Sequence, residues 1–263
     1  MFYKSYRNKE SRAIVALKPS ASKRLIAKAV KEMPEVKAAL KKGRIIIIGG
    51  TTNAYVAEEI LGKKVDKFWY AAGRIAFGEL GANESDKRIN PFVLKNGKVV
   101  DRVPKEMLQE FTADDVYIKG ANAVDADGHA GILMSNDKGG TMGAAMGILN
   151  ARGSHLIVPV GLEKLIPSVI YASERCGQGR LKYAMGHKVG MMPLVNAKVV
   201  TEVQAIEILF GTSEVRAAHV ASGGIAGSEG SVVLVLEGDD KGVKRAFDFI
   251  CGIREEDMIV PQM

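Results

Sequence analysis

Apolar residues follow two periods along the chain, one typical of helices and one of buried strands. In residues 21–33 they recur every three or four positions, which predicts an amphipathic helix that Pro34 interrupts and 36–42 continues. Residues 45–48 are consecutive isoleucines. An uninterrupted run of β-branched residues predicts a parallel strand that is buried on both faces.

Helices and strands continue to alternate through residue 196. Helices are predicted at 54–61, 104–111 and 141–151, and strands at 74–77, 116–119 and 155–160. Asn96-Gly97 supplies the positive φ angles of a two-residue turn and predicts a hairpin over 92–100. This alternation predicts a protein of the α/β class with a Rossmann-like, doubly wound parallel sheet.

After residue 196 the order of elements changes. Strands are predicted at 198–202, 215–222, 231–237 and 257–260, and helices at 202–210 and 240–250. The order βαββαβ is typical of a smaller ferredoxin-like α+β domain. We therefore expect two domains: a Rossmann-like anion- or metabolite-binding domain at 1–196 with a basic N-terminal helix, and a ferredoxin-like domain at 197–263.

A homo-oligomer is expected from the size of the second domain. A unit of about 65 residues buries only a modest hydrophobic core. Pairing with the same unit of a second subunit would cover its apolar strand at 232–236, and two-fold homodimers are the commonest assembly. The sequence therefore predicts that this domain lies at the subunit contact.

The composition is that of a globular protein, and it excludes several classes. The 263 residues are 47% hydrophobic and 25% charged, so disorder is excluded as the main state. No apolar run reaches the roughly 20 residues of a membrane span. The first twelve residues lack the apolar core of a signal peptide, so a cytoplasmic protein without a membrane partner is expected. Two cysteines and four scattered histidines indicate neither a disulfide framework nor a metal site.

The net charge of +7 comes from the first 44 residues, and the rest of the chain is close to neutral. Such a segment is a solvated helix face, an anion-attracting rim or a nucleic-acid surface. It lacks the interleaved aromatic residues and the groove-reading motifs of nucleic-acid binding proteins. A solvated helix face is therefore expected, and nucleic acid is not expected as a partner.

A glycine-rich turn follows the isoleucine strand. Gly49, Gly50, Thr51, Thr52 and Asn53 connect that strand to a helix. Free backbone N–H groups, threonine hydroxyls and the helix N-terminus together favour a phosphate or carboxylate. The motif is neither a P-loop nor a dinucleotide fingerprint. The alternative is a plain strand-to-helix turn that Thr51 or Thr52 caps.

A second glycine-rich loop precedes another helix. It contains Asn136, Lys138, Gly139, Gly140 and Thr141. A lysine beside free N–H groups can hold a phosphate or polarise a carbonyl. The alternative is a lysine in a solvated loop.

Four motifs in this order resemble the superfamily that joins ribose-5-phosphate isomerase, glucosamine-6-phosphate deaminase, the CoA transferases and the sugar-sensing domains of certain bacterial repressors. The motifs lie within about residues 21–170 and are Gly50-Thr51-Thr52, Gly120-Ala121-Asn122 with Asp125-Ala126-Asp127-Gly128, the loop from Asn136 to Thr141, and Val160-Gly161-Leu162-Glu163-Lys164-Leu165-Ile166-Pro167. The resemblance implies that the first motif binds phosphate.

The chain lacks the acids that the isomerase uses. In the isomerase, the element after the second strand resembles Asp-Gly-Ala-Asp-Glu. This chain has Lys119-Gly120-Ala121-Asn122-Ala123 at that place, and its predicted helix at 141–151 contains no glutamate. Moving a proton between adjacent carbons requires a positioned base. Ribose-5-phosphate isomerase activity is therefore not expected.

Other acidic residues leave further chemistry open. CoA transferases form an acyl-CoA anhydride on a glutamate, and Glu229 lies in a loop similar to their Ser-Glu-Asn-Gly element, although it also fits a plain hairpin loop. Glu163 ends a sheet strand, where ligands of open α/β sheets bind. His129 could reach the same edge. The polar linker at 175–182 could close over an anion, with a surface loop as the alternative.

These features predict that the chain binds a small phosphorylated or carboxylated metabolite at the carboxyl ends of its strands. Lys138 and Glu163 are the candidate catalytic residues, and Gly120, Asn122 and Lys164 join the two glycine-rich segments as candidate ligand-binding residues. The alternatives are a non-catalytic metabolite sensor or assembly module and a CoA transferase-like acyl transfer. No cofactor other than CoA is expected, and the sequence leaves open whether a reaction is catalysed.

Overall fold

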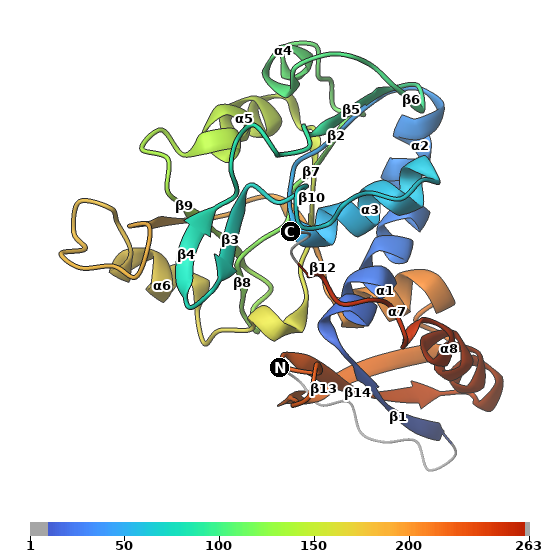
Figure 1. The fold of residues 1–263 in the computed structure, drawn as a ribbon. Helices are drawn as coiled ribbons and strands as arrows, with labels where there is room; N and C mark the ends of the chain where they lie inside the picture. Colours follow the sequence, from blue (N-terminus) through green and yellow to red (C-terminus); the bar gives the residue numbers. More distant parts are fainter. Residues whose placement is uncertain (1–9, 261–263) are drawn as a thin grey trace.

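A six-stranded sheet lies at the centre of the computed structural model, which describes residues 10–260 (Figure 1). In sheet order its strands are β12 (Ala197–Val200), β10 (His155–Pro159), β7 (Val116–Ile118), β2 (Arg44–Ile47), β5 (Phe92–Lys95) and β6 (Lys98–Val99). The first four are parallel, and β5 and β6 are antiparallel to their neighbours. The protein is therefore of the mixed α/β class.

The predicted wholly parallel sheet is wrong at its β5–β6 edge. Asn96 and Gly97 adopt positive φ angles of 52° and 76°, so the predicted hairpin forms and its strands must run antiparallel. The hairpin then pairs with the edge of β2. The predicted burial of the isoleucine strand is confirmed, because Ile45, Ile46 and Ile47 are fully buried.

Helices cover both faces of this sheet. The helices of the described residues are α1 (Pro19–Glu32), α2 (Pro34–Lys41), α3 (Thr51–Leu61), α4 (Pro104–Leu108), α5 (Gly140–Arg152), α6 (Val169–Arg175), α7 (Glu202–Phe210) and α8 (Asp240–Ile253), with a 3-10 turn, η1, at Leu162–Lys164. Of these, α6 and α8 pack against other sheets. Figure 1 shows α1, α2, α3 and α7 on one side of the sheet and α4 and α5 on the other. Local signals set several ends: Gly62 and Gly153 end α3 and α5 in left-handed conformations, and Thr201 with Gln204 forms a capping box on α7.

A second sheet is antiparallel and contains β1 (Ser11–Leu17), β14 (Ser231–Gly238) and β13 (Val215–Gly223) in that order. The strand β1 was not predicted. The predicted strand at 198–202 is found as β12, but it pairs with β10 in the large sheet, and 257–260 forms no strand. The ferredoxin-like layout is therefore not confirmed, and strands of both sheets come from both sides of residue 196.

The pairing of β1 has a physical reason in its alternating pattern. Val15 and Leu17 face inward and are buried, whereas Ile14, which precedes Val15, is 65% exposed, and Ala16 between the two is exposed as well. Leu17 lies opposite Val232 and Val15 opposite Leu234, so the strand covers the apolar edge of β14 along seven residue pairs.

Two smaller sheets stand beyond the carboxyl ends of the central strands. One is the hairpin of β3 (Gly73–Ala76) and β4 (Glu79–Ala82), of which β3 was predicted. The other contains β11 (Gly190–Pro193), β9 (Ala130–Met134) and β8 (Ala123–Val124).

Helix α1 lies between the two larger sheets and contacts α3, α7, α8, β10 and β14. Leu25 and Ile26 are fully buried. The expected solvated basic face is wrong at Lys23 and Arg24, which are each only 7% exposed. Their charges are tolerated inside because carboxylates that are distant in the sequence surround them.

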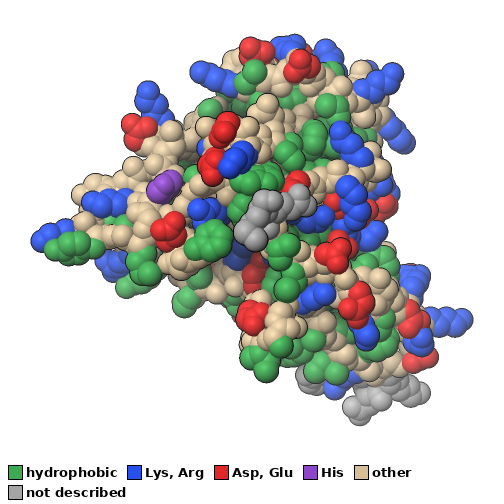
Figure 2. All heavy atoms as spheres, viewed as in Figure 1, with side chains coloured by type: hydrophobic (Ala, Val, Ile, Leu, Met, Phe, Trp, Pro, Cys, Tyr) green, Lys and Arg blue, Asp and Glu red, His purple; other side chains and the backbone are tan. Residues whose placement is uncertain are grey.

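Basic side chains do not gather in one stripe on the face shown in Figure 2, where Lys and Arg alternate with Asp and Glu. Residues 1–9, which contain part of the basic segment, lie outside the described residues. Over residues 10–260, every helix is too short or too polar to cross a membrane.

Candidate functional site

A cavity of about 840 Å³ lies at the carboxyl ends of β2 and β7. The turn Ile48–Thr52 and the segment Lys119–Asn122 form one side of it. Residues between 68 and 91, including the β3–β4 hairpin, form another. Because β2 and β7 are parallel neighbours, their carboxyl ends meet at one sheet edge, which is where open α/β sheets bind ligands.

The glycine turn after β2 leaves the N-terminus of α3 open to this cavity. A Cβ atom on Gly49 would lie 2.5 Å from the Tyr70 carbonyl oxygen, so only glycine fits there. A Cβ on Gly50 would meet nothing within 4 Å. Gly50 precedes the helix, and no side chain of the described chain caps it. The alternative of a turn capped by Thr51 or Thr52 is therefore not found, and first-turn N–H groups stay free of helix partners.

Thr52 and Asn53 have different positions within this turn. The Thr52 side chain lines the cavity, is 2% exposed, and its Oγ1 has no hydrogen-bond partner among residues 10–260. The Asn53 side chain does not line the cavity. Its Nδ2 donates to the carbonyls of Ile48 (2.6 Å) and Ile118 (3.3 Å), so Asn53 joins the ends of β2 and β7.

Five cationic side chains line the cavity, and they come from separate parts of the chain. They are Lys23, Arg74, Arg88, Lys119 and Lys164. Arg74 Nη1 and Arg88 Nε are buried and have no acceptor within the described structure. Glu229 is the acidic side chain on the lining, and its Oε2 accepts from the Gly227 N–H at 3.0 Å.

The lysines of the cavity differ in their partners. Lys23 Nζ donates to Glu163 Oε1 at 2.9 Å, and Lys164 Nζ donates to the Ala121 carbonyl at 3.0 Å. Lys119 Nζ has no hydrogen bond or ion pair to any residue in 10–260. Burial and the charge of Lys164 lower the pKa of Lys119 to about 8. The cavity lining therefore carries more positive than negative charge, and the charges of Lys119 and Lys164 lie close enough to repel each other.

Two glutamates lie behind this lysine group rather than on the lining. Burial alone would raise the pKa of Glu163, but the charges of Lys23 and Lys164 outweigh it, and the pKa is lowered. Glu202 is fully buried and accepts from the Leu162 N–H at 2.9 Å. Burial, followed by the charge of Glu163, raises the pKa of Glu202 to about 7. Glu163 thus lies where a counter-ion for Lys23 is needed, outside the cavity lining.

The second glycine-rich loop contributes only its ends to the cavity. Ser135 and Thr141 line it, whereas Asn136, Lys138, Gly139 and Gly140 do not. Asn136 Oδ1 accepts from the N–H groups of Lys138 (2.9 Å) and Gly140 (3.3 Å), which folds the loop on itself. The exposed Lys138 is therefore not brought to the first glycine turn. Gly120, Asn122 and Lys164, in contrast, lie on the lining as the sequence places them.

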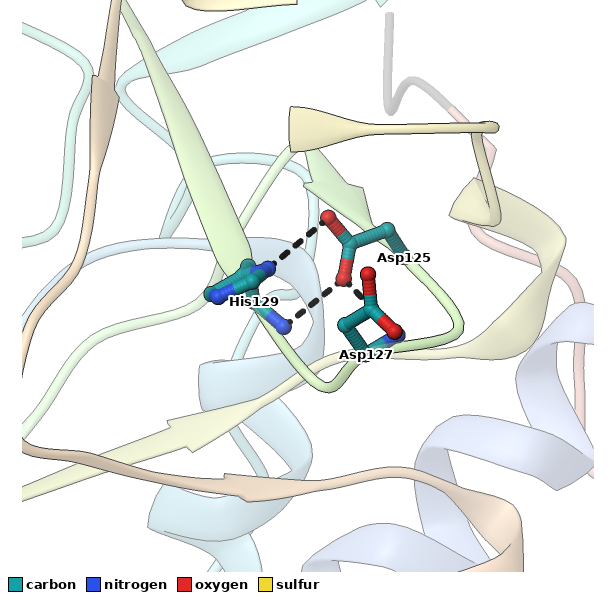
Figure 3. Close-up of side chains that lie close together, drawn as sticks. All are labelled: Asp125, Asp127 and His129. Atoms are coloured by element: carbon teal, nitrogen blue, oxygen red, sulfur yellow. Dashed lines mark hydrogen bonds and ion pairs between the residues drawn. The ribbon is translucent and has the colours of Figure 1, made fainter. Parts of the chain in front are cut away.

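Asp125, Asp127 and His129 lie close together in the loop after β8 (Figure 3). The Asp125 carboxylate accepts from the N–H groups of Asp127, His129 and Val169 and from His129 Nδ1. Burial would raise the pKa of Asp125, but the N–H groups of Val169 and His129 lower it. Both oxygens are thus used to shape the loop. His129 does not line the cavity, and neither do residues 175–182.

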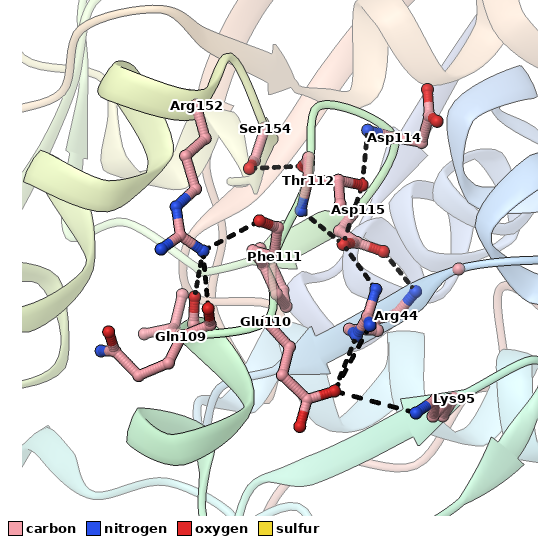
Figure 4. Close-up of polar contacts among 12 residues, drawn as sticks. Arg44, Lys95, Gln109, Glu110, Phe111, Thr112, Asp114, Asp115, Arg152 and Ser154 are labelled. Atoms are coloured by element: carbon pink, nitrogen blue, oxygen red, sulfur yellow. Dashed lines mark hydrogen bonds and ion pairs between the residues drawn. The ribbon is translucent and has the colours of Figure 1, made fainter.

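A polar network at the opposite, amino ends of β2 and β7 has a structural role (Figure 4). The Asp115 carboxylate accepts from the Arg44 and Thr112 N–H groups at 2.6 and 2.7 Å. Arg152 Nη1 donates to the carbonyls of Leu108, Gln109 and Phe111. These bonds fasten the connection between α4 and β7 to the sheet and to α5.

Sequence reasoning missed Lys23, Arg74, Arg88 and Lys119. One signal for Lys119 was present, since it directly follows a buried strand of the parallel sheet, whose carboxyl end is the expected ligand edge. Arg74 and Arg88 lie in a segment without a clear period, and the partner of Lys23 is 140 residues away. Nothing local to these three residues indicated a site.

Comparison of the chain with protein families, curated proteins and solved structures finds no match.

Proposed function

We propose that this protein binds a small molecule that carries a phosphate or carboxylate group, with the anion at the N-terminus of α3. One observation carries the proposal: the Thr52 hydroxyl is buried and unpartnered among the described residues, at an uncapped helix N-terminus on a cavity that five cations line. Helix N-termini bind anions through free N–H groups and the helix dipole. Lys119 and Lys164 add full positive charges on the same side.

The size and the walls of the cavity support a ligand larger than the anion alone. Its volume of about 840 Å³ lies within the roughly 300–1,000 Å³ of small-molecule sites. Phe68, Ile75, Phe77 and Leu80 line the side formed by the β3–β4 region. An anionic group at α3 and a less polar body against these side chains would use both parts.

The wider assignment belongs to the same proposal. On the four motifs of the sequence, we assign the chain to the ribose-5-phosphate isomerase, deaminase and CoA transferase superfamily, with a Rossmann-like arrangement of the large sheet and a cytoplasmic location. A homo-oligomer is also proposed, and light scattering of the full chain tests it. A monomer at all concentrations contradicts that part.

With Asn122 in place of an acid, no conversion of ribose 5-phosphate to ribulose 5-phosphate is expected.

Thermal unfolding with inorganic phosphate and with ribose 5-phosphate, at constant ionic strength, tests the binding proposal. Ligand that binds only the folded state raises Tm with ln(1 + [L]/Kd). The variant Gly50→Asp adds a carboxylate where a Cβ meets nothing within 4 Å, so the fold is retained and the anion is repelled. We expect the rise in Tm to disappear. Gly147→Asp, at another open glycine in α5, is the matched control.

The outcome that overturns the proposal is a rise in Tm that Gly50→Asp leaves intact, or no rise with either anion. Thr52→Val is a second variant, which removes the hydroxyl and keeps the shape. It should weaken phosphate binding about tenfold, the value of one hydrogen bond to a charged group. Binding should also weaken above pH 8, because Lys119 then loses its proton.

A CoA transferase-like acyl transfer is the second candidate, because Glu229 lies on the cavity lining. A glutamate there could attack an acyl-CoA and form the anhydride that such transfer requires. The test is exchange of acetyl groups between acetyl-CoA and carboxylic acids. Loss of exchange in Glu229→Gln supports this candidate, and absence of exchange in the unaltered protein removes it in favour of a non-catalytic sensor.

A further inference from the structure

We propose that Lys119 is a nucleophilic lysine that forms an imine with an aldehyde or ketone group of the bound anion. The proposal rests on the proposed function and narrows its ligand to a phosphorylated or carboxylated carbonyl compound, such as an oxo acid or an open-chain sugar phosphate.

The backbone of Lys119 is held by the sheet, and the residue lines the cavity. Its N–H donates to the Ile157 carbonyl at 3.0 Å and so continues the pairing of β7 with β10. The preceding carbonyl, that of Ile118, accepts from the Ile48 N–H at 3.0 Å. The backbone of Lys119 is thus held between both neighbouring strands, and its side chain lines the cavity beside the glycine turn. A nucleophile needs this kind of fixed placement against its substrate.

Lys119 is also distinguished from the other two lysines by its bonding. Lys23 is held by Glu163 and by the Pro19 carbonyl, and Lys164 by the Ala121 carbonyl. These partners keep Lys23 and Lys164 as fixed donors that attract an anion. The Lys119 amine has no acceptor in the described part of the chain, so its nitrogen is free to turn toward a ligand.

The surroundings of Lys119 increase the fraction of neutral amine, which is the form that attacks a carbonyl. Burial and the adjacent charge of Lys164 lower its pKa to about 8. About one molecule in ten then has the free amine at pH 7, against fewer than one in a thousand for a solvated lysine. Burial beside a second cation is a known way to activate a lysine for imine formation.

The reaction balances without a further reactant. The Nζ lone pair attacks the carbonyl carbon, a C–N bond forms, and the carbonyl electrons move to oxygen. Protons pass from nitrogen to that oxygen, and the C–O bond breaks to release one water and leave the C=N bond. No atom is oxidised or reduced. The free N–H groups of α3 and the hydroxyl of Thr52 would hold the anionic group meanwhile.

Pyridoxal 5′-phosphate is a suitable probe, because it carries both an aldehyde and a phosphate. The full-length protein is incubated with the probe, reduced with borohydride, digested and mapped by mass spectrometry. We expect the adduct on Lys119 at pH 7, about a hundredfold above exposed lysines, with a rate that rises through a midpoint near pH 8. Inorganic phosphate should suppress it, and pyridoxal without the phosphate should label Lys119 far less.

Variants make the assignment specific. Lys119→Arg keeps the charge, cannot form the imine, and should lose the adduct while retaining the rise in Tm with phosphate. Lys98→Arg, at an exposed position on β6, should label as the unaltered protein does. The peptide map of the unaltered protein gives the answer independently if Lys119→Arg does not fold.

Three results would overturn the proposal that Lys119 forms an imine. Labelling of Lys23 or Lys164 in place of Lys119, labelling spread evenly over exposed lysines, or a midpoint near the ordinary lysine pKa all exclude a nucleophilic Lys119. If phosphate still raises Tm in that case, the anion site stands and Lys119 is a binding cation only. If phosphate has no effect on Tm, the proposed function fails as well.

Discussion

Arg24 is a single side chain that connects three parts of the molecule. Its guanidinium lies 2.5 Å from Glu58, 2.8 Å from Glu59 and 2.8 Å from Glu256. The first two belong to α3, and Glu256 follows α8. Bonds from Lys67, the Val65 N–H and Arg24 outweigh the effect of burial and lower the pKa of Glu58 to about 2. The network thus holds α1 against α3 and the C-terminal segment.

Arg24→Met should strongly destabilise the protein. The substitution keeps an apolar stem but leaves carboxylates that have lost their buried counter-ion. Breaking a buried pair in this way costs about 3–5 kcal/mol, which urea unfolding at pH 7 measures. Arg254→Met is the control, since Arg254 is largely exposed and its pairing with Glu255 contributes little. Equal stabilities of the two variants would contradict the role given to Arg24.

Glu202 should make stability fall as the pH rises toward neutrality. Its pKa is raised from 4.5 to about 7 in the folded state. Between these values the folded protein keeps a proton that the unfolded chain has lost, so the stability present below pH 4.5 is lost as the pH passes through 7. Glu202→Gln keeps the acceptor for the Leu162 N–H and removes the titration. At pH 8 it should be more stable than the unaltered protein, by up to about 3 kcal/mol.

Urea unfolding of Glu202→Gln and of the unaltered protein at pH 5, 6.5 and 8 measures this difference in stability. Glu58 has the opposite effect on the pH dependence of stability. Because its pKa is lowered to about 2, it contributes stability above pH 4.5 that is lost as the pH falls toward 2. Glu58→Gln should therefore destabilise the protein at pH 8, where Glu202→Gln stabilises it. A Glu202→Gln variant with an unchanged pH profile would show that Glu202 titrates normally.

At the scale of elements, the turn between β2 and α3 depends on two glycines for different reasons. Gly49 is required because the chain passes the Tyr70 carbonyl too closely for a side chain. Gly50 has open space around it and an extended backbone, so its lack of a side chain serves the cavity. The first glycine is thus structural, and the second keeps the helix N-terminus accessible.

Gly49→Ala and Gly50→Ala form a matched pair. Gly49→Ala should destabilise the fold by about 1–3 kcal/mol, the usual effect of forcing an extra methyl group into a packed site. Gly50→Ala should change stability by less than about 0.5 kcal/mol. Thermal unfolding of both variants measures the difference. Similar losses in the two would mean that the close approach to Tyr70 does not determine the turn.

At the scale of the whole molecule, β1 connects the N-terminal part of the chain to the C-terminal sheet. It pairs with β14 along seven residue pairs, and it leads directly into α1, which packs against the large sheet and against α8. A chain that ended at residue 196 would leave β1 without β14 and expose the apolar residues of α1. The two sheets therefore share one continuous core.

Unfolding of the full chain should accordingly be a single cooperative transition. Trp69 is the only tryptophan and lies beside Phe68 near the cavity, so its fluorescence reports on that region. Far-ultraviolet circular dichroism reports on all helices and sheets. The two signals should coincide in a urea titration. Separate midpoints would contradict a shared core and favour two independent domains.

Local chemistry was enough to predict much of this fold. The isoleucine run, the Asn96-Gly97 hairpin, the helix that Gly62 ends and the glycine turn before α3 are all confirmed. Each depends on interactions among neighbours in the chain: β-branched packing, positive φ angles, capping and helix periodicity. The cavity at the carboxyl ends of β2 and β7 also follows from this pattern, once the strands are parallel.

The partners of strands and of buried charges depended on the folded chain. The pattern of β12 fits either sheet, and only its contact with β10 places it. Lys23 and Arg24 look like solvated basic residues, and they are buried because Glu163 and Glu256 reach them from 140 and 232 residues away. Lys119 acquires its environment in the same way, from Lys164 and the packing around both. Burial free energy and the interaction of charges depend on distance in space, which the order of residues does not contain.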